Sequence, residues 1–286
     1  MRVDHVSIAV QEIDTALPFF CRVLPTEMRA PKRPGYTDDF NWCDFYVGNF
    51  KLELIEGTRT DSFVRRFLSK RGEGLHHLSI EVDALDPLLA RMERDGVRIV
   101  DRFDAGDGEQ TAFIHPRSAH GILVQFWQVR HIEAPPRPAV VPFRLRSGET
   151  LAARVDHLST AVHDINATLA FFARYFPIQV RREKHMAYNG AFAVGSFWLN
   201  GYKMELIQPP DGAHTGFVAQ FLDKRGEGLH HISVHFNRIE PLIAQLEADG
   251  VRIVDKSVRG PKTAFISPRS AHGVLLQLWE EPELHL

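Results

Sequence analysis

The chain repeats itself at a distance of 152 to 154 residues. Three segments occur twice with few changes: GEGLHHLSIEV (72–82) and GEGLHHISVHF (226–236), DGVRIVD (95–101 and 249–255), and AFIHPRSAHGILVQFW (112–127) and AFISPRSAHGVLLQLW (264–279). The offset is 152 residues from His5 to His157 and 154 from His77 to His231, so the length differences are expected in loops. Because similar segments favour similar structures, the two halves are predicted to share one fold.

Each half contains a second, fainter repeat. Four segments with strand-like alternation place a histidine two residues before a serine: VDHVSIAV (3–10), LHHLSIEV (75–82), VDHLSTAV (155–162) and LHHISVHF (229–236). Each histidine precedes a polar residue within a later apolar run by 46 or 48 residues, in the pairs His5 and Glu53, His77 and Gln125, His157 and Glu205, and His231 and Gln277. The chain is therefore predicted to contain four related units.

The four units share one order of elements. An alternating strand is followed by an amphipathic helix and then by two or three further strands, the last of them apolar. The helical segments are DTALPFFCRVL (14–24), DPLLARMERDG (86–96), ATLAFFARYF (167–176) and EPLIAQLEADG (240–250). This order predicts an α+β fold made of four β-α-β-β-β units.

Length and composition favour two domains. A chain of 286 residues with 44% hydrophobic content can form two ordinary cores. Residues 129–152 contain four prolines and show no periodicity, which is typical of a linker. We therefore expect an N-terminal domain at 1–130, a linker at 131–152 and a C-terminal domain at 153–286.

The charge and the cysteines limit the class of partner and compartment. With 34 basic and 36 acidic residues the formal net charge is −2, so we expect a small-molecule substrate and neither nucleic acid nor membrane as a partner. Cys21 and Cys43 are too few for a disulfide framework and are expected to be buried thiols. The N-terminus lacks the pattern of a signal peptide, and no run of about 18 apolar residues occurs, which predicts a cytoplasmic protein.

Strand alternation assigns the histidines to one face of the predicted sheet. In the first strand, Val6 and Ile8 point to one side, whereas His5 and Ser7 point to the other. The apolar side can pack on the helix, which leaves the histidine side for a concave interior.

The same alternation separates the adjacent histidines of the second and fourth units. His77 is in register with Ser79, whereas His76 is in register with Leu78. We therefore choose His77 and His231 as the inward-facing candidate ligands, with His76 and His230 as the alternative candidates.

The motifs HVSIAV, KLELIE, GLHHLSIEV and HPRSAHGILVQF, carried on tandem β-α-β-β-β units, resemble the vicinal oxygen chelate superfamily. This superfamily includes glyoxalases, bleomycin resistance proteins and extradiol dioxygenases, and the similarity is greatest to methylmalonyl-CoA epimerase-like and glyoxalase-like proteins. The resemblance covers nearly all of both halves apart from the linker. It implies that two units close into a half-open barrel of eight strands around one divalent metal ion, with two ligands from each unit.

The resemblance implies a complete ligand set in each half. Carried over by position, the ligands are His5, Glu53, His77 and Gln125 in the first half, and His157, Glu205, His231 and Gln277 in the second. Imidazole nitrogen combined with carboxylate and amide oxygen suits zinc, cobalt, manganese, nickel or iron(II) rather than calcium.

The last ligand of each set departs from the family pattern. The resembling epimerases and glyoxalases have a glutamate there that can act as a base, whereas this chain has Gln125 and Gln277. An amide cannot accept a proton at neutral pH. Proton abstraction would therefore fall to Glu53 or Glu205, to water or hydroxide on the metal, or to a nearby residue that the sequence does not identify.

Three classes of function fit these residues. The first is a metal-dependent isomerase, epimerase or lyase that chelates vicinal oxygens of a carbonyl or acyl-CoA substrate and stabilises an enolate-like intermediate. The second is an iron(II)-dependent ring-cleaving or 2-oxo-acid dioxygenase, because two histidines and one glutamate match the facial triad of such enzymes. The third is a non-catalytic small-molecule binding protein. A homodimer is compatible with all three.

Other polar motifs have simpler structural interpretations. His120 and His272 in the PRSAHG segments could face a substrate, but these segments also satisfy the requirements of a turn, which is the simpler interpretation. Glu73 and Glu227, with neighbouring Arg71 and Arg225, lie in RGEG segments that follow helical stretches, where glycine marks a helix end. The aromatic residues of the third strands are expected to pack in the core: Phe40, Trp42, Phe45, Tyr46, Phe192, Phe197 and Trp198.

Overall fold

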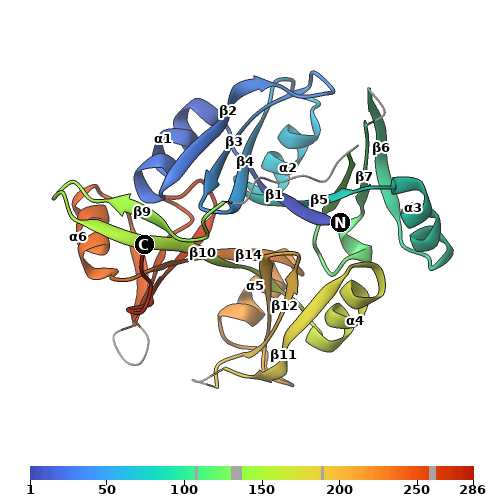
Figure 1. Cartoon of the computed structure of the whole chain (residues 1–286). Coiled ribbons are helices and arrows are strands. Elements are labelled where there is room, and N and C mark those ends of the chain that lie inside the picture. Colours follow the sequence, from blue (N-terminus) through green and yellow to red (C-terminus); the bar gives the residue numbers. More distant parts are fainter. Residues whose placement is uncertain (107–108, 130–136, 188–189, 258–261) are drawn as a thin grey trace. The chain divides into compact units, whose positions relative to one another are not determined.

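The computed structural model describes residues 1–286 except 107–108, 130–136, 188–189 and 258–261. Its described elements follow the order β-α-β-β-β four times, with an additional helix after the first and third units (Figure 1). The α+β fold of four repeated units predicted from the sequence is confirmed.

The first half forms a mixed sheet of eight strands in the part of the chain that the structure describes. Their spatial order is β2-β3-β4-β1-β5-β8-β7-β6. The bounds are Arg2–Ala9 (β1), Thr26–Pro34 (β2), Phe40–Val47 (β3), Phe50–Gly57 (β4), Gly74–Val82 (β5), Ile99–Gly106 (β6), Glu109–Ile114 (β7) and Val124–Gln128 (β8).

The second half repeats this arrangement in the order β11-β12-β13-β10-β14-β17-β16-β15, with β9 added beside β10. The bounds are Val141–Arg144 (β9), Thr150–Ala161 (β10), Ile178–Met186 (β11), Ala193–Leu199 (β12), Tyr202–Gln208 (β13), Gly228–Phe236 (β14), Ile253–Ser257 (β15), Thr263–Ile266 (β16) and Leu275–Glu280 (β17).

The first strand of each unit pairs in parallel with the last strand of the same unit. Val6 lies opposite Leu52 in β1 and β4, and Leu78 lies opposite Val124 in β5 and β8. A parallel pair needs a long crossover connection, and the helix and two antiparallel strands of the unit provide it. The first and last strands, which carry the predicted ligands, are therefore neighbours in every unit.

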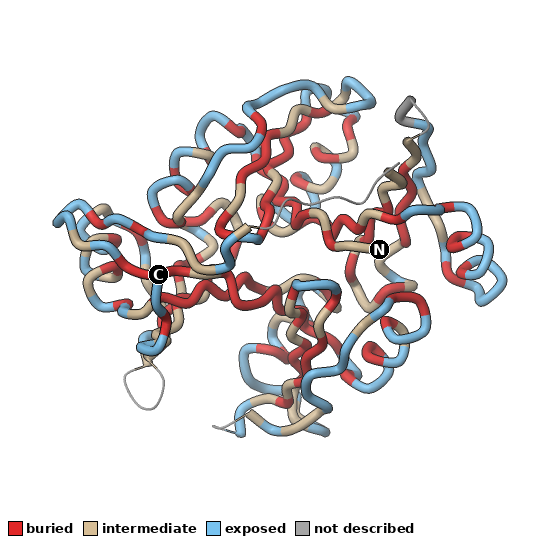
Figure 2. The backbone as a smooth tube through the Cα atoms, in the orientation of Figure 1, coloured by how far each residue is buried: buried red, intermediate tan, exposed pale blue. Residues whose placement is uncertain are grey.

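The helices lie where the amphipathic segments predict them. Their bounds are Ile13–Val23 (α1), Phe63–Arg71 (α2), Leu85–Arg94 (α3), Ile165–Tyr175 (α4), Phe217–Arg225 (α5) and Glu240–Ala248 (α6). In α1 the buried residues include Ile13, Ala16, Phe20 and Val23, which is the spacing of one helix face. Buried segments follow the strands and one side of the helices (Figure 2). None of the described helices has the length and apolar character needed to span a bilayer.

Matching side chains fix the start of the first helix in each half. Glu56, in β4, accepts a hydrogen bond of 2.6 Å from the backbone N–H of Ile13. Gln208, in β13, accepts one of 2.9 Å from the backbone N–H of Ile165. Each bond satisfies a helix N–H that has no partner within the helix, and it ties the helix to the last strand of its unit.

The predicted linker contains a short strand pair that the sequence pattern did not indicate. Residues 131–136 lie outside the described residues, but β9 pairs with the start of β10, where Phe143 lies opposite Leu151. Phe143, Leu145 and Leu151 are buried, so apolar side chains stabilise a hairpin in a segment too short to show periodicity. The predicted domain limits at 130 and 153 stay a prediction.

The prediction that both cysteines are buried is wrong for Cys21. Cys43 in β3 is buried, and burial raises the pKa of its thiol to about 12. Cys21 is exposed, because it follows Phe20 on α1 and one residue turns the side chain by about 100° around the helix, away from the buried face.

The contacts of the described chain divide it into two compact units that cut across the sequence repeat. Unit 1 consists of Met1–His5, His77–Ala134 and His157–His230, and unit 2 consists of Val6–His76, Pro135–Asp156 and His231–Leu286. Each of these two compact units, named unit 1 and unit 2 from here on, thus contains one β-α-β-β-β segment from each half of the sequence.

Within unit 2, the PRSAHG turn of the second half meets the RGEG segment of the first. His272 Nδ1 lies 3.2 Å from Glu73 Oε2, and Glu73 also accepts a hydrogen bond from the backbone N–H of Gln11. Gly273 packs so closely that a Cβ atom there would lie 1.7 Å from the carbonyl oxygen of Glu73.

Unit 1 contains the corresponding contact. His120 Nδ1 lies 3.8 Å from Glu227 Oε1, and a Cβ at Gly121 would lie 2.0 Å from the carbonyl oxygen of Glu227. The helices before both RGEG segments end at Gly72 and Gly226, with φ of 74° and 72°. The structural interpretations of both motifs are confirmed, and both motifs also join the two halves of the sequence.

Candidate metal centres

The structure brings the predicted polar residues of the first half together. Ligand atoms of His5, Glu53 and His77 lie within 4.8 Å of one another. His5 Nε2 lies 3.4 Å from His77 Nε2, which in turn lies 3.1 Å from Gln125 Oε1. Gln125 Nε2 donates to the hydroxyl of Thr111, so the amide oxygen is held toward the histidines.

The second half forms a matching cluster. Ligand atoms of His157, Glu205 and His231 lie within 4.8 Å of one another, and His157 Nε2 is 3.4 Å from Glu205 Oε1. The Ser159 hydroxyl donates to the same carboxylate oxygen at 3.2 Å. Gln277 Oε1 is buried and has no hydrogen-bond partner among the described residues.

One strand register explains why all four units contribute in the same way. The serine two residues after each inward-facing histidine is the direct strand partner of the predicted glutamate or glutamine. The four pairs are Ser7 and Glu53, Ser79 and Gln125, Ser159 and Glu205, and Ser233 and Gln277. Because paired residues share a face of the sheet, the histidine, the serine and the last-strand residue of each unit all point to the same side.

The donor atoms fit a divalent transition metal. Two nitrogen ligands at about 2.0–2.1 Å from a zinc ion with tetrahedral angles lie about 3.3–3.4 Å apart, and the His5 and His77 nitrogens are 3.4 Å apart. Gln277 Oε1 and the hydroxyls of Ser7, Ser79 and Ser233 are buried without a hydrogen-bond partner among the described residues. Buried oxygens without partners are costly, and a cation or substrate would satisfy them.

A carboxylate lies close to the first histidine of each set. Asp4 Oδ2 is 2.7 Å from His5 Nδ1, which leaves Nε2 to face His77. In the second half, ligand atoms of Asp156, His157 and His235 lie within 4.8 Å of one another. A carboxylate in this position orients a metal-binding histidine and raises its basicity. Neither aspartate was predicted from the sequence, although the VDH tripeptide occurs in the first strand of each half.

The alternative candidates, His76 and His230, lie in a different environment. His76 packs against Phe67 of α2, with ring centroids 4.7 Å apart, and His230 packs at the same distance against Phe221 of α5. Burial lowers the pKa of each imidazole to about 4. The structure thus groups His77 and His231, rather than these neighbours, with the other ligand candidates.

A second acidic residue, which the sequence did not reveal, stands beside Glu53. Asp44 in β3 is the direct strand partner of Glu53, so both side chains lie on the same face. Its carboxylate is buried, accepts a 2.8 Å hydrogen bond from Arg29 and lies 3.9 Å from the Lys51 ammonium group. No repeat reveals it, because the corresponding residue in the second half is Ser196, the strand partner of Glu205.

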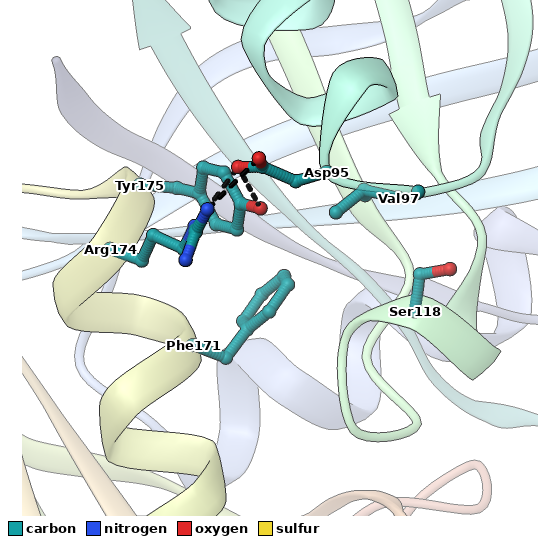
Figure 3. A pocket seen from close by; sticks show the side chains of 7 residues that line it. Asp95, Val97, Ser118, Phe171, Arg174 and Tyr175 are labelled. Atoms are coloured by element: carbon teal, nitrogen blue, oxygen red, sulfur yellow. Dashed lines mark hydrogen bonds and ion pairs between the residues drawn. The ribbon is translucent and has the colours of Figure 1, made fainter.

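Unit 1 also contains an open pocket of about 380 Å³, lined by Asp95, Gly96, Val97, Ser118, Phe171, Arg174 and Tyr175 (Figure 3). Asp95 accepts hydrogen bonds from the Arg174 guanidinium and the Tyr175 hydroxyl. These contacts join α4 to the end of α3, and the lining residues do not include the predicted ligands. The pocket therefore reflects helix packing in unit 1 rather than the chemistry of the His and Glu clusters.

Comparison with known proteins shows the family to which the chain belongs. The sequence-family model of the glyoxalase/bleomycin resistance protein/dioxygenase superfamily matches the chain twice, at residues 4–113 and 156–265. The two matches together cover well over half of the chain. The chain belongs to this superfamily. It is a tandem member, with one match in each half of the sequence.

The relatives that are similar in sequence each match less than half of the chain. An uncharacterized protein, YqjC of Bacillus subtilis, is 36% identical over 126 residues, which are 43% of this chain and 89% of that protein. The mitochondrial methylmalonyl-CoA epimerase of Bos taurus is 30% identical over 130 residues, 44% of this chain and 74% of the epimerase.

A solved structure matches the tandem chain over nearly its whole length. A 4-hydroxymandelate synthase variant from Streptomyces coelicolor covers 98% of this chain and 92% of its own, with a TM-score of 0.66 and 16% identity. At that identity the similarity concerns the fold alone. The relatives that are similar in sequence include methylmalonyl-CoA epimerases, which supports an enzyme in general terms.

Proposed function

We propose that the chain is a metal-dependent enzyme that binds two neighbouring oxygens of a small carbonyl or acyl-CoA substrate and moves a proton on the carbon beside the carbonyl. The observation that carries this proposal is the convergence of His5, Glu53 and His77, whose ligand atoms lie within 4.8 Å of one another. The acyl-CoA class is suggested by the similarity to methylmalonyl-CoA epimerase.

His5, Glu53, His77 and Gln125 would hold a metal ion in the first half, and His157, Glu205, His231 and Gln277 would hold one in the second. A bound divalent metal supplies Lewis-acid chemistry, which polarises a carbonyl and acidifies the neighbouring C–H bond. The residues of the chain must then provide the group that accepts the proton.

Asp44 and Glu53 are the carboxylates of the first half that can accept this proton. Glu53 was predicted from the sequence, but its oxygen belongs to the ligand cluster. Asp44 is one methylene shorter and lies on the adjacent strand in direct register with Glu53. Directly paired residues have Cβ atoms about 5 Å apart, so Asp44 can face a substrate that is bound next to the ligands. We therefore assign proton transfer to Asp44.

The proposal is tested by hydrogen exchange. Metal-loaded protein is incubated in deuterated water with methylmalonyl-CoA and, separately, with pyruvate, and deuterium incorporation beside the carbonyl is followed by NMR. We expect metal-dependent incorporation into at least one probe, abolished by a chelator and restored by added metal. Incorporation that is the same with and without metal would overturn the proposal.

The same metal-loaded sample addresses the oxygenase alternative, because two histidines and one glutamate are also the ligand set of iron(II) oxygenases. Oxygen uptake with a catechol or a 2-oxo acid, in the absence of any hydrogen exchange, would replace the proton-transfer proposal by a dioxygenase.

A further inference from the structure

The two candidate centres share most of their polar surroundings but differ at the carboxylate that is paired with the ligand glutamate. The residues that correspond across the repeat of 152 positions include Arg29 and Arg181, Lys51 and Lys203, Glu53 and Glu205, and Asp44 and Ser196. In both halves the residue at the last position is the direct strand partner of the ligand glutamate. An acid in the first half is thus replaced by a neutral alcohol in the second.

We infer that the two halves are chemically unequal: the first half carries out proton transfer, and the second half binds metal and ligand without carrying out this step. The inference rests on the proposed function and adds to it which half reacts. The inference follows from a comparison of position 44 with position 196. The residue on the same face as the ligand glutamate is a proton acceptor, Asp44, in the first half and a neutral alcohol, Ser196, in the second.

Ser196 cannot replace Asp44 in this role. A serine hydroxyl accepts or gives up a proton only with the help of an adjacent base. The carboxylate directly opposite Ser196 is Glu205, which already accepts a hydrogen bond from Ser159 and lies 3.4 Å from His157. Glu205 therefore belongs to the ligand cluster. It is not available as a base to activate the hydroxyl of its strand partner Ser196.

A second acidic position, Glu81 in the first half, also differs between the halves. In the first half, Glu81 of β5 forms an ion pair with Arg2. The corresponding residue in the second half is His235, whose Nδ1 lies 2.9 Å from Glu281 and whose Nε2 lies 3.6 Å from Asp156. The two halves thus retain the ligands while two of the surrounding acidic positions have changed.

The natural repeat supplies variants that are expected to fold. Asp44→Ser reproduces in the first half the combination of arginine, lysine and serine that the second half already contains. Ser196→Asp reproduces in the second half the combination found in the first. Ser196→Ala is the matched control, because it removes the hydroxyl without adding a charge. Circular dichroism and metal content of each variant check that fold and ligand set are intact.

The test is the rate of deuterium incorporation into methylmalonyl-CoA or pyruvate, whichever the wild-type chain exchanges. Asp44→Ser is expected to lower the rate at least about 100-fold, the smallest usual contribution of a general base, whereas Ser196→Ala stays within about twofold. Adding Ser196→Asp to Asp44→Ser is expected to raise the rate at least about tenfold above that of Asp44→Ser alone.

Wild-type exchange rates in Asp44→Ser would overturn the inference, and so would a double variant that stays at the level of Asp44→Ser. Either result leaves the proposed function standing, because the wild-type chain still exchanges. A wild-type chain without metal-dependent exchange overturns the proposed function itself, so the two failures are distinguishable.

Discussion

His5 Nδ1 lies 2.7 Å from the carboxylate of Asp4, while Nε2 of the same ring faces His77 at 3.4 Å. Adjacent residues of one strand thus provide both a candidate metal ligand and the group that orients it. The carboxylate favours the tautomer in which Nδ1 carries the proton and Nε2 offers its lone pair to a metal.

Replacing Asp4 by asparagine is therefore expected to weaken metal binding to the first half by about 10- to 100-fold, the usual effect of losing such a partner. Competition with a chromophoric chelator measures the affinity. Asp14→Asn is the control, because Asp14 is an exposed carboxylate on α1 that pairs with Lys32. Equal affinities of the two variants would show that Asp4 does not support the ligand.

The contact between His272 and Glu73 predicts a pH dependence of stability. The hydrogen bond with His272 is the largest influence on the Glu73 carboxyl, whose pKa is lowered in the folded protein. A lowered folded-state pKa stabilises the protein above the unfolded-state pKa of about 4.3, and this stabilisation is lost as the pH falls through the folded-state value.

Glu73→Gln is accordingly expected to lower the free energy of unfolding by about 0.5–1 kcal/mol at pH 7, within the usual range of one hydrogen bond, and by less near pH 3. Urea unfolding at both pH values provides the measurement. Glu227→Gln should have the smaller effect at pH 7, because burial opposes the ionised form of Glu227 and His120 lies farther away, at 3.8 Å. A loss of stability that is the same at both pH values would argue against a stabilising hydrogen bond between His272 and the ionised Glu73 carboxylate.

The close approach of Gly273 to the carbonyl of Glu73 predicts a large cost for any side chain. Gly273 has a φ of 76°, and its added Cβ would lie 1.7 Å from that oxygen. Gly273→Ala is expected to destabilise by more than about 2 kcal/mol, because backbone strain of about 1–2 kcal/mol adds to a backbone clash.

Gly96→Ala separates the two causes. Gly96 has a similar φ of 80°, but no atom lies within 4 Å of an added Cβ, so only the strain of about 1–2 kcal/mol is expected. Urea midpoints that are equal for the two alanine variants would mean that the packing of the PRSAHG turn against Glu73 contributes nothing.

The sequence was sufficient to predict the four units, and it also led to the proposal that His5, Glu53, His77 and Gln125 form one ligand set. Both predictions depend on local periodicity, since strand alternation fixes the face of each residue and the repeat fixes the spacing. Asp44 could not be found in this way, because its place beside Glu53 depends on the pairing of β3 with β4.

Contacts between segments that are distant in the sequence also could not be predicted from the sequence pattern. PRSAHG and RGEG each suit a turn or a helix end, and neither motif indicates that His272 meets Glu73. The two compact units, each with segments from both halves, follow from such tertiary contacts. Local periodicity carries no information about which units pack together.

We propose that each half of the sequence holds a divalent metal through its histidines, glutamate and glutamine. The decisive measurement is elemental analysis of protein that is purified without added metal and then saturated with metal and desalted. We predict about two equivalents of a transition metal per chain, falling to about one when His5 and His77 are both changed to alanine. A stoichiometry near zero in the saturated wild-type protein would contradict the claim.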